Sequence, residues 1–371
     1  MIHEFTPIQL LLNSSGIFIG LLVVVTVLLL LAERYLLNYG ACKVDINSGE
    51  RILETEGGNT LLHALLENAI FIPSACGGHG TCGFCKATIT EGGGPVLSTE
   101  ITFLSRTEQR AGVRLSCQVK IRNDVRIKIP EELFNVKMFQ TTVLSTRNVT
   151  HDIKEIRFSL IEPDTITQRP GQYIQVQIPT PDGPVFRAYS ISSPSSKNSI
   201  VELNVRLIPN GVGSTWLHNL KLNDSANLTG PYGEFHLDED PNTEIICVGG
   251  GAGMAPMKNI IYSIYEKWPN RSVWLFFGCR STRDVFYLEE YRELAKQFPS
   301  FKIKYALSDP LVEGEKWDDE RGFIHLAVDK YIVPGNPRKA FLCGPPPMID
   351  AVTRILEDKG LKPADIFYDK F

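Results

Sequence analysis

Four of the eight cysteines follow a spacing typical of one kind of site, and this spacing constrains the chain more than any other feature. The pattern is C-x5-C-x2-C with a fourth cysteine after a further 31 residues, and its members are Cys76, Cys82, Cys85 and Cys117. Four thiolates can hold a zinc ion or an iron–sulfur cluster. Structural zinc sites usually have two C-x2-C pairs and this chain has one, so the spacing favours a 2Fe–2S cluster over structural zinc.

The loop that carries the first three of these cysteines is rich in glycine. Its glycines let the backbone wrap closely and direct N–H groups at sulfur atoms, which helps to set the potential of a cluster. They are Gly77, Gly78, Gly80 and Gly83. We interpret His79 as a polar loop residue, because the four cysteines already complete the site. Eight cysteines in 371 residues are too few for a disulfide scaffold, which indicates a reducing compartment.

An apolar run near the N-terminus predicts a membrane anchor. Residues Ile17 to Ala32 contain one polar side chain, that of Thr26. A helix of this length rises about 24 Å, so crossing the hydrocarbon core also needs the flanking residues. A cleaved signal peptide fits less well, because no Lys or Arg precedes the run. Arg34 and Lys43 follow it, and the positive-inside rule then places the C-terminal part in the cytoplasm.

The overall composition excludes several classes of protein. A formal net charge of −4, with 38 Lys and Arg against 42 Asp and Glu, argues against a nucleic-acid-binding protein, which usually carries a basic excess. With 43% hydrophobic and 22% charged residues, the chain is an ordinary globular one, neither disordered nor a multi-span transporter. Its length has room for two to three domains of roughly 100–200 residues each.

From Lys137 to about Leu237 the sequence consists of short alternating stretches with turn signals, which predict a small antiparallel barrel. Within it, Arg187 and Tyr189 of an R-x-Y-S motif fall on one face of a strand, and Ser190 follows. A guanidinium suits a phosphate, and a tyrosine ring suits the face of a flavin. Taken alone, the motif is equally consistent with an exposed strand that has ordinary pairing.

A glycine-rich turn further along the barrel strengthens the flavin prediction. It opens a predicted helix, where backbone N–H groups and the helix dipole can hold a pyrophosphate. Its predicted cofactor-binding residues are Gly211, Gly213, Ser214 and Thr215. The stretch from Gly230 to Phe235 is interpreted as a turn that closes the barrel. The order of these motifs predicts a flavin-binding domain.

The last third of the chain alternates strand and helix patterns, which predicts a parallel sheet. The buried strand Ile245–Val248 ends in a glycine loop of the strand–loop–helix kind that binds phosphate. The predicted nucleotide-binding residues of this loop are Gly249, Gly250, Gly251, Gly253 and Pro256. Pro256 replaces the last glycine of the usual motif, and proline suits a first helical turn.

A second motif ends the last strand of this alternation, at Cys343, Gly344 and Pro345. Ligands of open parallel sheets bind beyond the carboxyl ends of the strands, so Cys343 is positioned for function. The alternative is a small apolar residue at a strand end. Arg280 and Arg283 follow an earlier strand, where they could bind a 2′-phosphate or pair with nearby acidic side chains, and the sequence leaves both open.

These segments predict a multidomain chain with four parts. Residues 1–37 form a single transmembrane helix, residues 38–133 an α+β ferredoxin-like 2Fe–2S domain, residues 134–240 an antiparallel β-barrel flavin domain, and residues 241–371 an α/β parallel-sheet NAD domain.

With these motifs in this order, the chain resembles the F subunits of the bacterial Na+-translocating NADH:quinone reductases. The likeness covers nearly the whole chain and rests on the cysteine spacing, R-x-Y-S, the segment Gly249–Met257, the motif C-G-P-P-P-M and the ending Asp369-Lys-Phe371. One departure is that the chain lacks the long insertion that family members usually carry before R-x-Y-S.

The resemblance implies NADH, FAD and a 2Fe–2S cluster as the redox groups, with other membrane subunits of the reductase and, indirectly, a quinone as the partners. It implies that Arg187, Tyr189 and Ser190 contact the flavin, that Cys343 lies near the nicotinamide, and that Phe371 covers the flavin ring. Ser190, Cys343 and Phe371 are therefore the predicted catalytic residues. The implied location is the bacterial inner membrane, with one span and cytoplasmic C-terminal domains.

The three redox groups fit one order of transfer. NADH gives a hydride, which carries two electrons together, whereas a cluster accepts one, so the flavin belongs between them. The sequence leaves two other functions open. One is a membrane-tethered NAD(P)H reductase that supplies an oxygenase or desaturase, and the other is an electron carrier or scaffold that uses the cluster alone.

Overall fold

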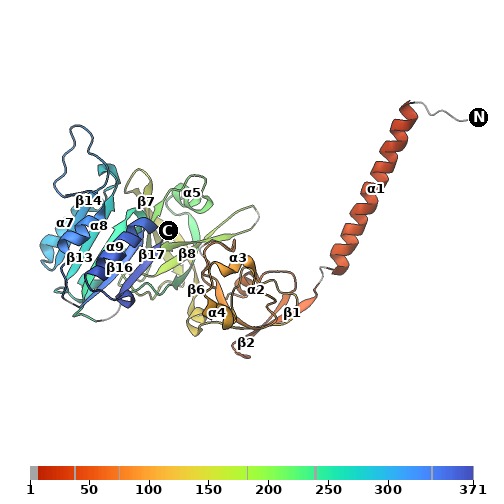
Figure 1. Cartoon of the computed structure of the whole chain (residues 1–371), viewed down its shortest axis with the longest axis horizontal. Coiled ribbons are helices and arrows are strands. Elements are labelled where there is room, and N and C mark those ends of the chain that lie inside the picture. The colour runs from red at the N-terminus through yellow and green to blue at the C-terminus, as the bar shows by residue number, and fades with distance from the viewer. Residues whose placement is uncertain are drawn as a thin grey trace, which may run out of the picture. The chain divides into compact units, whose positions relative to one another are not determined.

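The structure, a computed structural model, describes residues 7–36, 39–74, 76–181, 183–237, 240–335 and 337–370, without the side chains of residues 7–14, 31–36 and 135. The chain forms two compact units (Figure 1). The first comprises Met1–Ile72 and Gly78–Leu133, and the second comprises Pro73–Gly77 and Phe134–Phe371.

Helix α1 (Pro7–Leu36) contains the apolar run of the sequence. Its described side chains are exposed, and the hydroxyl of Thr26 donates to the carbonyl oxygen of Leu22 (2.8 Å), so the polar side chain of the run is satisfied within the helix. Over the residues that the structure describes, no helix has both the length and the apolar character needed to cross a membrane. The membrane span therefore stays a prediction.

The rest of the first unit is built on a five-stranded sheet with the order β2-β1-β5-β3-β4. Strands β1 and β5 are parallel and the other pairs are antiparallel. The strands are β1 (Ala41–Ile46), β2 (Arg51–Glu56), β3 (Lys86–Glu91), β4 (Val113–Leu115) and β5 (Val125–Lys128). Two short helices, α3 (Ser98–Ile101) and α4 (Arg106–Arg110), lie between β3 and β4 in the sequence.

Helix α2 (Leu61–Glu67) forms where leucines recur at helical spacing. The hydroxyl of Thr60 accepts a hydrogen bond from the backbone N–H of His63 (3.3 Å), which caps the first turn. Leu61, Leu62 and Leu65 are buried, so the apolar face of the helix contributes to the core of this unit.

The barrel of the second unit has six antiparallel strands in the order β10-β7-β6-β11-β8-β9. A bridge between Ile191 and Leu203 joins the two edges, which closes the barrel. The strands are β6 (Lys137–Asn148), β7 (Ile153–Glu162), β8 (Tyr173–Ile178), β9 (Val185–Ser190), β10 (Ile200–Arg206) and β11 (Ser225–Tyr232). Helix α5 (Val212–Asn219) follows β10, where the glycine-rich turn predicts a helix start.

The first half of the stretch from Gly230 to Phe235 is strand and not the predicted turn, whereas Gly233 to Phe235 lie beyond the strand. Strand β11 continues through Pro231 to Tyr232, which pairs with Tyr173 of β8 after a shift in register. A proline is tolerated where the ladder is irregular, because no hydrogen bond from its nitrogen is needed there. The rings of Tyr173 and Tyr232 stack with their centroids 5.5 Å apart, which stabilises this end of the strand pair.

The nucleotide domain is a six-stranded sheet, parallel throughout, with the order β15-β14-β13-β12-β16-β17. Its strands are β12 (Glu244–Gly250), β13 (Val273–Cys279), β14 (Phe301–Leu307), β15 (Glu320–Arg321), β16 (Arg338–Gly344) and β17 (Ile366–Lys370). Its helices are α6 (Met254–Lys267), α7 (Leu288–Gln297), α8 (Ile324–Tyr331) and α9 (Pro346–Asp358). The predicted alternation of strand and helix is therefore confirmed.

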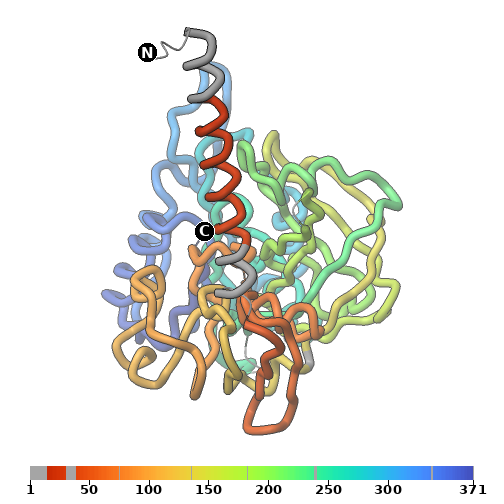
Figure 2. Tube along the Cα trace, turned by 90° about the vertical axis from the view of Figure 1, so that its right-hand side faces the viewer, coloured from red at the N-terminus to blue at the C-terminus, as the bar shows by residue number. Residues whose placement is uncertain are grey.

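Helices cover both faces of this sheet, so successive residues of a strand enter different cores. On β12, Ile245 and Cys247 belong to the core with α6 and α7, whereas Ile246 and Val248 belong to the core with α8 and α9. Ile153 of the barrel also joins the first of these cores. The barrel and the nucleotide domain therefore lie side by side in one unit, as Figure 2 shows in yellow-green and blue.

Candidate cofactor sites

The predicted cluster ligands lie in and beside a loop whose glycines are all left-handed. Gly77, Gly78, Gly80 and Gly83 have φ of 67°, 91°, 72° and 73°, a region that favours glycine. Cys85 and Cys117 are buried and Cys82 is half-buried, whereas Cys76 lies in the segment Pro73–Gly77, which belongs to the other unit. A hydrogen bond with Cys117, together with burial, raises the pKa of the Cys85 thiol well above its usual range. Two buried thiols in contact fit a site in which a metal group replaces their protons.

Two further side chains support these cysteines. The amide Nε2 of Gln118 donates to Sγ of Cys117 (3.8 Å), while Oε1 of the same amide accepts from the hydroxyl of Thr99 (3.1 Å). The hydroxyl of Ser116 donates to the carbonyl oxygen of Cys85 (2.8 Å). The sequence reasoning missed these residues, because nothing in a lone glutamine or serine beside a ligand indicates which way it points.

The two predicted flavin motifs meet on one side of the barrel. Arg187 and Tyr189 of β9 lie opposite Val176 and Ile174 of β8. A Cβ on Gly213 of α5 would lie 2.8 Å from Cγ of Arg187 and 3.0 Å from the hydroxyl of Tyr189, so the first turn of α5 packs directly on both side chains. The structure thus brings R-x-Y-S and the glycine-rich turn together, as a shared flavin site requires.

The residues of the glycine-rich turn before α5 differ in burial and in hydrogen bonding. The hydroxyl of Ser214 is buried and accepts from the backbone N–H of Ile208 (3.0 Å), so it stabilises the turn that leads into α5. Gly211 is the N-cap of that helix, and Thr215 is exposed. Burial raises the pKa of Tyr189 to about 12, so its hydroxyl stays protonated at neutral pH and can donate.

The glycine loop of the nucleotide domain confirms the predicted strand–loop–helix arrangement. Strand β12 ends at Gly250, one 3-10 turn covers Gly251–Gly253, and α6 starts at Met254 with Pro256 in its first turn. A Cβ on Gly253 would lie 2.1 Å from the carbonyl oxygen of Cys343. The glycine loop and the end of β16 are therefore packed backbone against backbone, at the edge where nucleotides bind.

Cys343 and Gly344 lie at that carboxyl edge, as predicted. Cys343 is buried, and its register partners are Gly249 of β12 and Asp369 of β17. Burial, and next the charge of Asp369, raise the pKa of the Cys343 thiol well above its usual range. Burial also raises the pKa of Asp369. A neutral thiol at this place fits a contact surface for a ring better than a nucleophile.

Two arginines lie near the nucleotide loop in different surroundings. Arg206, at the end of β10, places its guanidinium against Gly251: a Cβ there would lie 2.9 Å or less from both of its terminal nitrogens. It also pairs with Asp152 (3.1 Å). Nη2 of Arg280 lies 3.7 Å from Oδ1 of Asp284. Pairing with an acidic side chain is one of the two roles that the sequence left open for Arg280. Sequence reasoning missed Arg206, whose strand belongs to the barrel.

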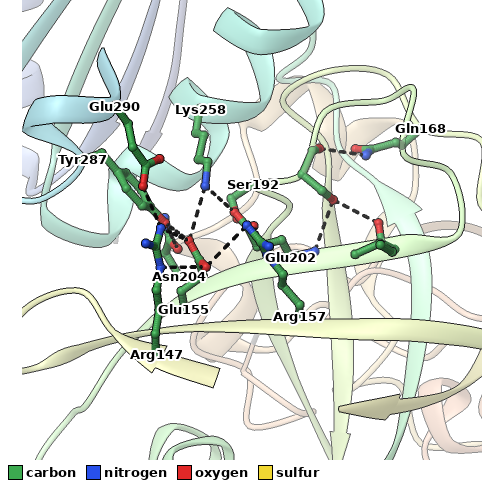
Figure 3. Close-up of polar contacts among 12 residues, drawn as sticks. Arg147, Glu155, Arg157, Gln168, Ser192, Glu202, Asn204, Lys258, Tyr287 and Glu290 are labelled. Atoms are coloured by element: carbon green, nitrogen blue, oxygen red, sulfur yellow. Dashed lines mark hydrogen bonds and ion pairs between the residues drawn. The ribbon is translucent and has the colours of Figure 1, made fainter. Parts of the chain in front are cut away.

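A buried group of charges joins the barrel to the nucleotide domain (Figure 3). Nζ of Lys258, on α6, lies 2.7 Å from Oε1 of Glu202 on β10 and 3.3 Å from Oε2 of Glu155 on β7. The hydroxyl of Tyr287 donates to Glu155 (2.6 Å) and lies 2.9 Å from the side-chain amide of Asn204. We call these five residues the boundary cluster. None of them belongs to a sequence motif.

Three family models match successive parts of the chain. Residues 44–122 match the 2Fe-2S iron-sulfur cluster binding domain, residues 140–237 the oxidoreductase FAD-binding domain, and residues 247–354 the oxidoreductase NAD-binding domain. The cofactor set of a 2Fe–2S cluster, FAD and NAD is therefore the one that the motifs predict.

The curated relatives match over nearly the full length. The F subunit of the Na+-translocating NADH-quinone reductase of Neisseria meningitidis is 35% identical over 397 aligned residues, which cover 95% of this chain and 97% of the relative. The chain belongs to the family of these F subunits. The relative of the same name in Pseudomonas aeruginosa is 34% identical, with 96% of this chain and 98% of the relative covered.

Among solved structures, two reductases superpose on most of this member of the F subunits. A cytochrome P450 reductase from Amycolatopsis superposes with a TM-score of 0.69 at 28% identity, with 89% of this chain and 98% of the other covered. A ferredoxin reductase in carbazole 1,9a-dioxygenase gives a TM-score of 0.67 at 26% identity and the same coverage. The resemblance in fold therefore extends over all three cofactor domains.

One predicted site residue falls outside these observations. Phe371, the predicted cover of the flavin ring, lies outside the described residues. The preceding residues of β17, up to Lys370, pair with β16 as far as Gly344. The role of Phe371 stays a prediction.

Proposed function

We propose that this member of the F subunits is the point of electron entry into a Na+-translocating NADH:quinone reductase. In this proposal it oxidises NADH and passes electrons through FAD and the 2Fe–2S cluster to a membrane partner of the complex. The observation that carries the proposal is the near-complete match to the F subunits, with all three cofactor domains present in one chain. Bound FAD supplies the conversion between two-electron and one-electron transfer.

The proposed nucleotide site is the edge of the parallel sheet. Gly249, Gly250, Gly251 and Gly253 form the loop that would hold the NADH pyrophosphate beside the start of α6, whose dipole favours negative charge. Cys343, Gly344 and Pro345 form the wall for the nicotinamide, and Phe371 is the proposed cover of the flavin ring. The buried, neutral thiol of Cys343 would present an uncharged surface to the nicotinamide.

The proposed flavin site is the face where β9 meets α5. Arg187 would pair with the flavin phosphate, Tyr189 would pack on the ring, and Ser190 would offer its hydroxyl as a hydrogen-bond donor to the flavin. The close packing of Gly213 on Arg187 and Tyr189 supports this arrangement. Gly211, Ser214 and Thr215 complete the turn that holds the pyrophosphate.

The proposed metal ligands are the four cysteines. Cys76, Cys82, Cys85 and Cys117 supply the four thiolates that a 2Fe–2S cluster requires, and the match of residues 44–122 supports this assignment.

We further propose that α1 anchors the chain in the bacterial inner membrane with the other domains in the cytoplasm. Support comes from the exposed apolar side chains of residues 17–30 and from the basic residues Arg34 and Lys43 that follow. An anchor raises the effective concentration of the cluster domain near a membrane acceptor. Washing membranes with alkaline carbonate tests it: the full chain should stay in the pellet, a variant without residues 1–37 should not, and release of the full chain would refute the anchor.

The second candidate function is a reductase that supplies electrons to an oxygenase. The likeness to the P450 reductase and to the carbazole dioxygenase reductase favours it. Affinity purification from native membranes distinguishes the two: quinone-reductase subunits that co-purify in fixed ratio support the first function, and an oxygenase component supports the second.

The electron path is tested on the purified full chain under anaerobic conditions. NADH should bleach the flavin absorbance and then produce the electron paramagnetic resonance signal of a reduced 2Fe–2S cluster. A preparation that holds FAD and inorganic sulfide but does not respond to NADH would refute the proposed function.

A further inference from the structure

The boundary cluster occupies positions that would face solvent if the barrel stood alone. On β7 and β10, Ile156 and Leu203 point into the barrel core, so their neighbours Glu155, Glu202 and Asn204 point outward. These three outward side chains are nevertheless 3–4% exposed. The nucleotide domain covers them, and it brings Lys258 (6% exposed) and Tyr287 (7% exposed) to meet them.

The carboxylates of this cluster are fully paired. Glu202 accepts from Lys258 (2.7 Å), from Arg157 (2.7 Å) and from Ser192 (2.8 Å). Glu155 accepts from Arg147 through both of its oxygens (3.0 Å each) and from Tyr287 (2.6 Å). A buried ion pair contributes little net stability compared with apolar packing, but its energy depends strongly on geometry. Such a cluster therefore fixes the relative position of two domains more sharply than apolar contact does.

Tyr287 adopts a strained backbone conformation at this boundary. Its φ of 57° and ψ of 15° place an aromatic residue in the left-handed region, at the N-cap of α7. Strain of this kind persists where surrounding contacts fix the residue, and it concentrates at functional sites. Here the contacts are the hydrogen bond to Glu155 and the ammonium of Lys258, which lies 4.2 Å from the centre of the tyrosine ring.

Lys258 connects this cluster to the nucleotide loop. It lies one turn into α6, the helix that starts at Met254 directly after the loop, and Gly253 of that loop packs on the backbone of Cys343. On the barrel side, Glu202 belongs to β10. The bridge between Leu203 and Ile191 connects β10 to the end of β9, the strand that carries the flavin motif and is called the flavin strand here. The ion pair of Lys258 and Glu202 is therefore one connection between the proposed nicotinamide wall and the flavin strand, and the contact of Arg206 with Gly251 is another.

We propose that Lys258 is a positioning residue for hydride transfer, which holds α6 and the nucleotide loop in fixed register with the flavin barrel through Glu202 and Glu155. Hydride transfer depends steeply on the distance between donor and acceptor, and a displacement of about 1 Å can cost roughly 100-fold in rate. Electron transfer from flavin to cluster is a later step, in which NADH takes no part. The inference rests on the proposed function, because it concerns the step in which NADH reduces the flavin.

The test compares Lys258→Met, which keeps the length and removes the charge, with Lys258→Arg, which restores the charge. The full chain with its cofactors is mixed with NADH in a stopped-flow instrument. In Lys258→Met, flavin reduction at saturating NADH should slow by about tenfold or more, with a smaller change in the dissociation constant of NADH. The charge-transfer absorbance between reduced flavin and NAD+ should weaken, and Lys258→Arg should recover most of both.

Two controls separate positioning from general damage. Lys267→Met removes an exposed lysine at the other end of α6 and should leave the rate of flavin reduction unchanged. Photoreduction of the flavin bypasses NADH, and the later reduction of the cluster should be equally fast in Lys258→Met and in the unaltered chain. Slowing of this photoreduced transfer by the same factor would refute a role confined to the boundary.

The outcomes are distinguishable from those for the proposed function. If NADH fails to reduce the flavin of the unaltered chain, the proposed function fails. If it does, and Lys258→Met keeps both the limiting rate and the charge-transfer absorbance, the positioning role is refuted. If Lys258→Met does not fold, Tyr287→Phe is the deciding variant. Loss of the Tyr287 hydroxyl should weaken the charge-transfer absorbance and slow the reduction of the flavin by NADH about two- to fivefold. Unchanged values of both would refute the proposal.

Discussion

Replacing Gly253 with alanine tests the packing between the nucleotide loop and the end of β16. Gly253 has φ of −62° and ψ of −6°, a conformation that any residue adopts, so the cost comes from contact alone. The new Cβ would lie 2.1 Å from the carbonyl oxygen of Cys343 and 2.6 Å from its carbonyl carbon. A carbon atom normally stays about 3.3 Å from such an oxygen, so the loop must move away from Cys343 by about 1 Å.

The expected loss follows from that displacement. The loop positions the nucleotide and Cys343 lies beside the proposed nicotinamide site, so a shift of about 1 Å should slow flavin reduction at saturating NADH roughly 100-fold. Overpacking should also lower the free energy of unfolding by about 1–3 kcal/mol. The FAD content should not change, because the flavin residues lie on β9 and α5.

Stopped-flow absorbance of the flavin and urea unfolding measure the two effects separately. Gly93→Ala is the matched control, because its Cβ would lie 2.6 Å from Cγ2 of Ile89, within the first unit. It should lower stability modestly and leave the limiting rate unchanged. A Gly253→Ala protein with full FAD content and the rate of the unaltered chain would show that the contact with Cys343 does not position the nucleotide.

Three other substitutions test the remaining sites. Cys82→Ala should remove the cluster absorbance and the inorganic sulfide while NADH still reduces the flavin; loss of both in a folded variant would contradict separate sites. Tyr189→Ala should lower the ratio of FAD to protein after gel filtration, whereas Tyr189→Phe should retain FAD, and full occupancy in the alanine variant would contradict the assigned ring contact. For Glu155, burial alone raises the pKa, but hydrogen bonds from Arg147 and Tyr287 and the charge of Lys258 lower it from 4.5 to about 2. The ionised Glu155 therefore stabilises the fold above about pH 4.5 by roughly 3 kcal/mol, and this contribution is lost as the pH falls towards 2. Urea unfolding should show Glu155→Gln less stable than the unaltered chain near pH 7 and nearly equal to it near pH 2; an equal difference at both would contradict the pairing.

The motifs that could be predicted from the sequence are those whose chemistry lies in neighbouring residues. R-x-Y-S and the glycine loop each place their functional groups within one turn or strand, and three of the four cysteines lie within ten residues, so most of their geometry follows from local structure. Helix α2 depends on local signals of the same kind, since its leucine face and its threonine cap both lie between Thr60 and Asn68.

What could not be predicted depends on pairing between distant segments. Lys258 and Glu155 are 103 positions apart, and each taken alone is an ordinary surface residue type. The role of Arg206 could not be predicted for the same reason, because its side chain contacts Gly251 of another domain. The prediction of a turn was wrong for Gly230 to Tyr232. Gly-Pro is a strong local turn signal, but pairing of Tyr232 with Tyr173 extends β11 past this dipeptide.

The place of β17 has a practical consequence for handling this protein. This last strand runs parallel to β16, with Asp369 beside Cys343 and Lys370 beside Gly344. A bulky label on a residue of β17 would lie next to the proposed nicotinamide wall and compete with the coenzyme for space. The same closeness makes a small reporter group on this strand a sensor of coenzyme occupancy.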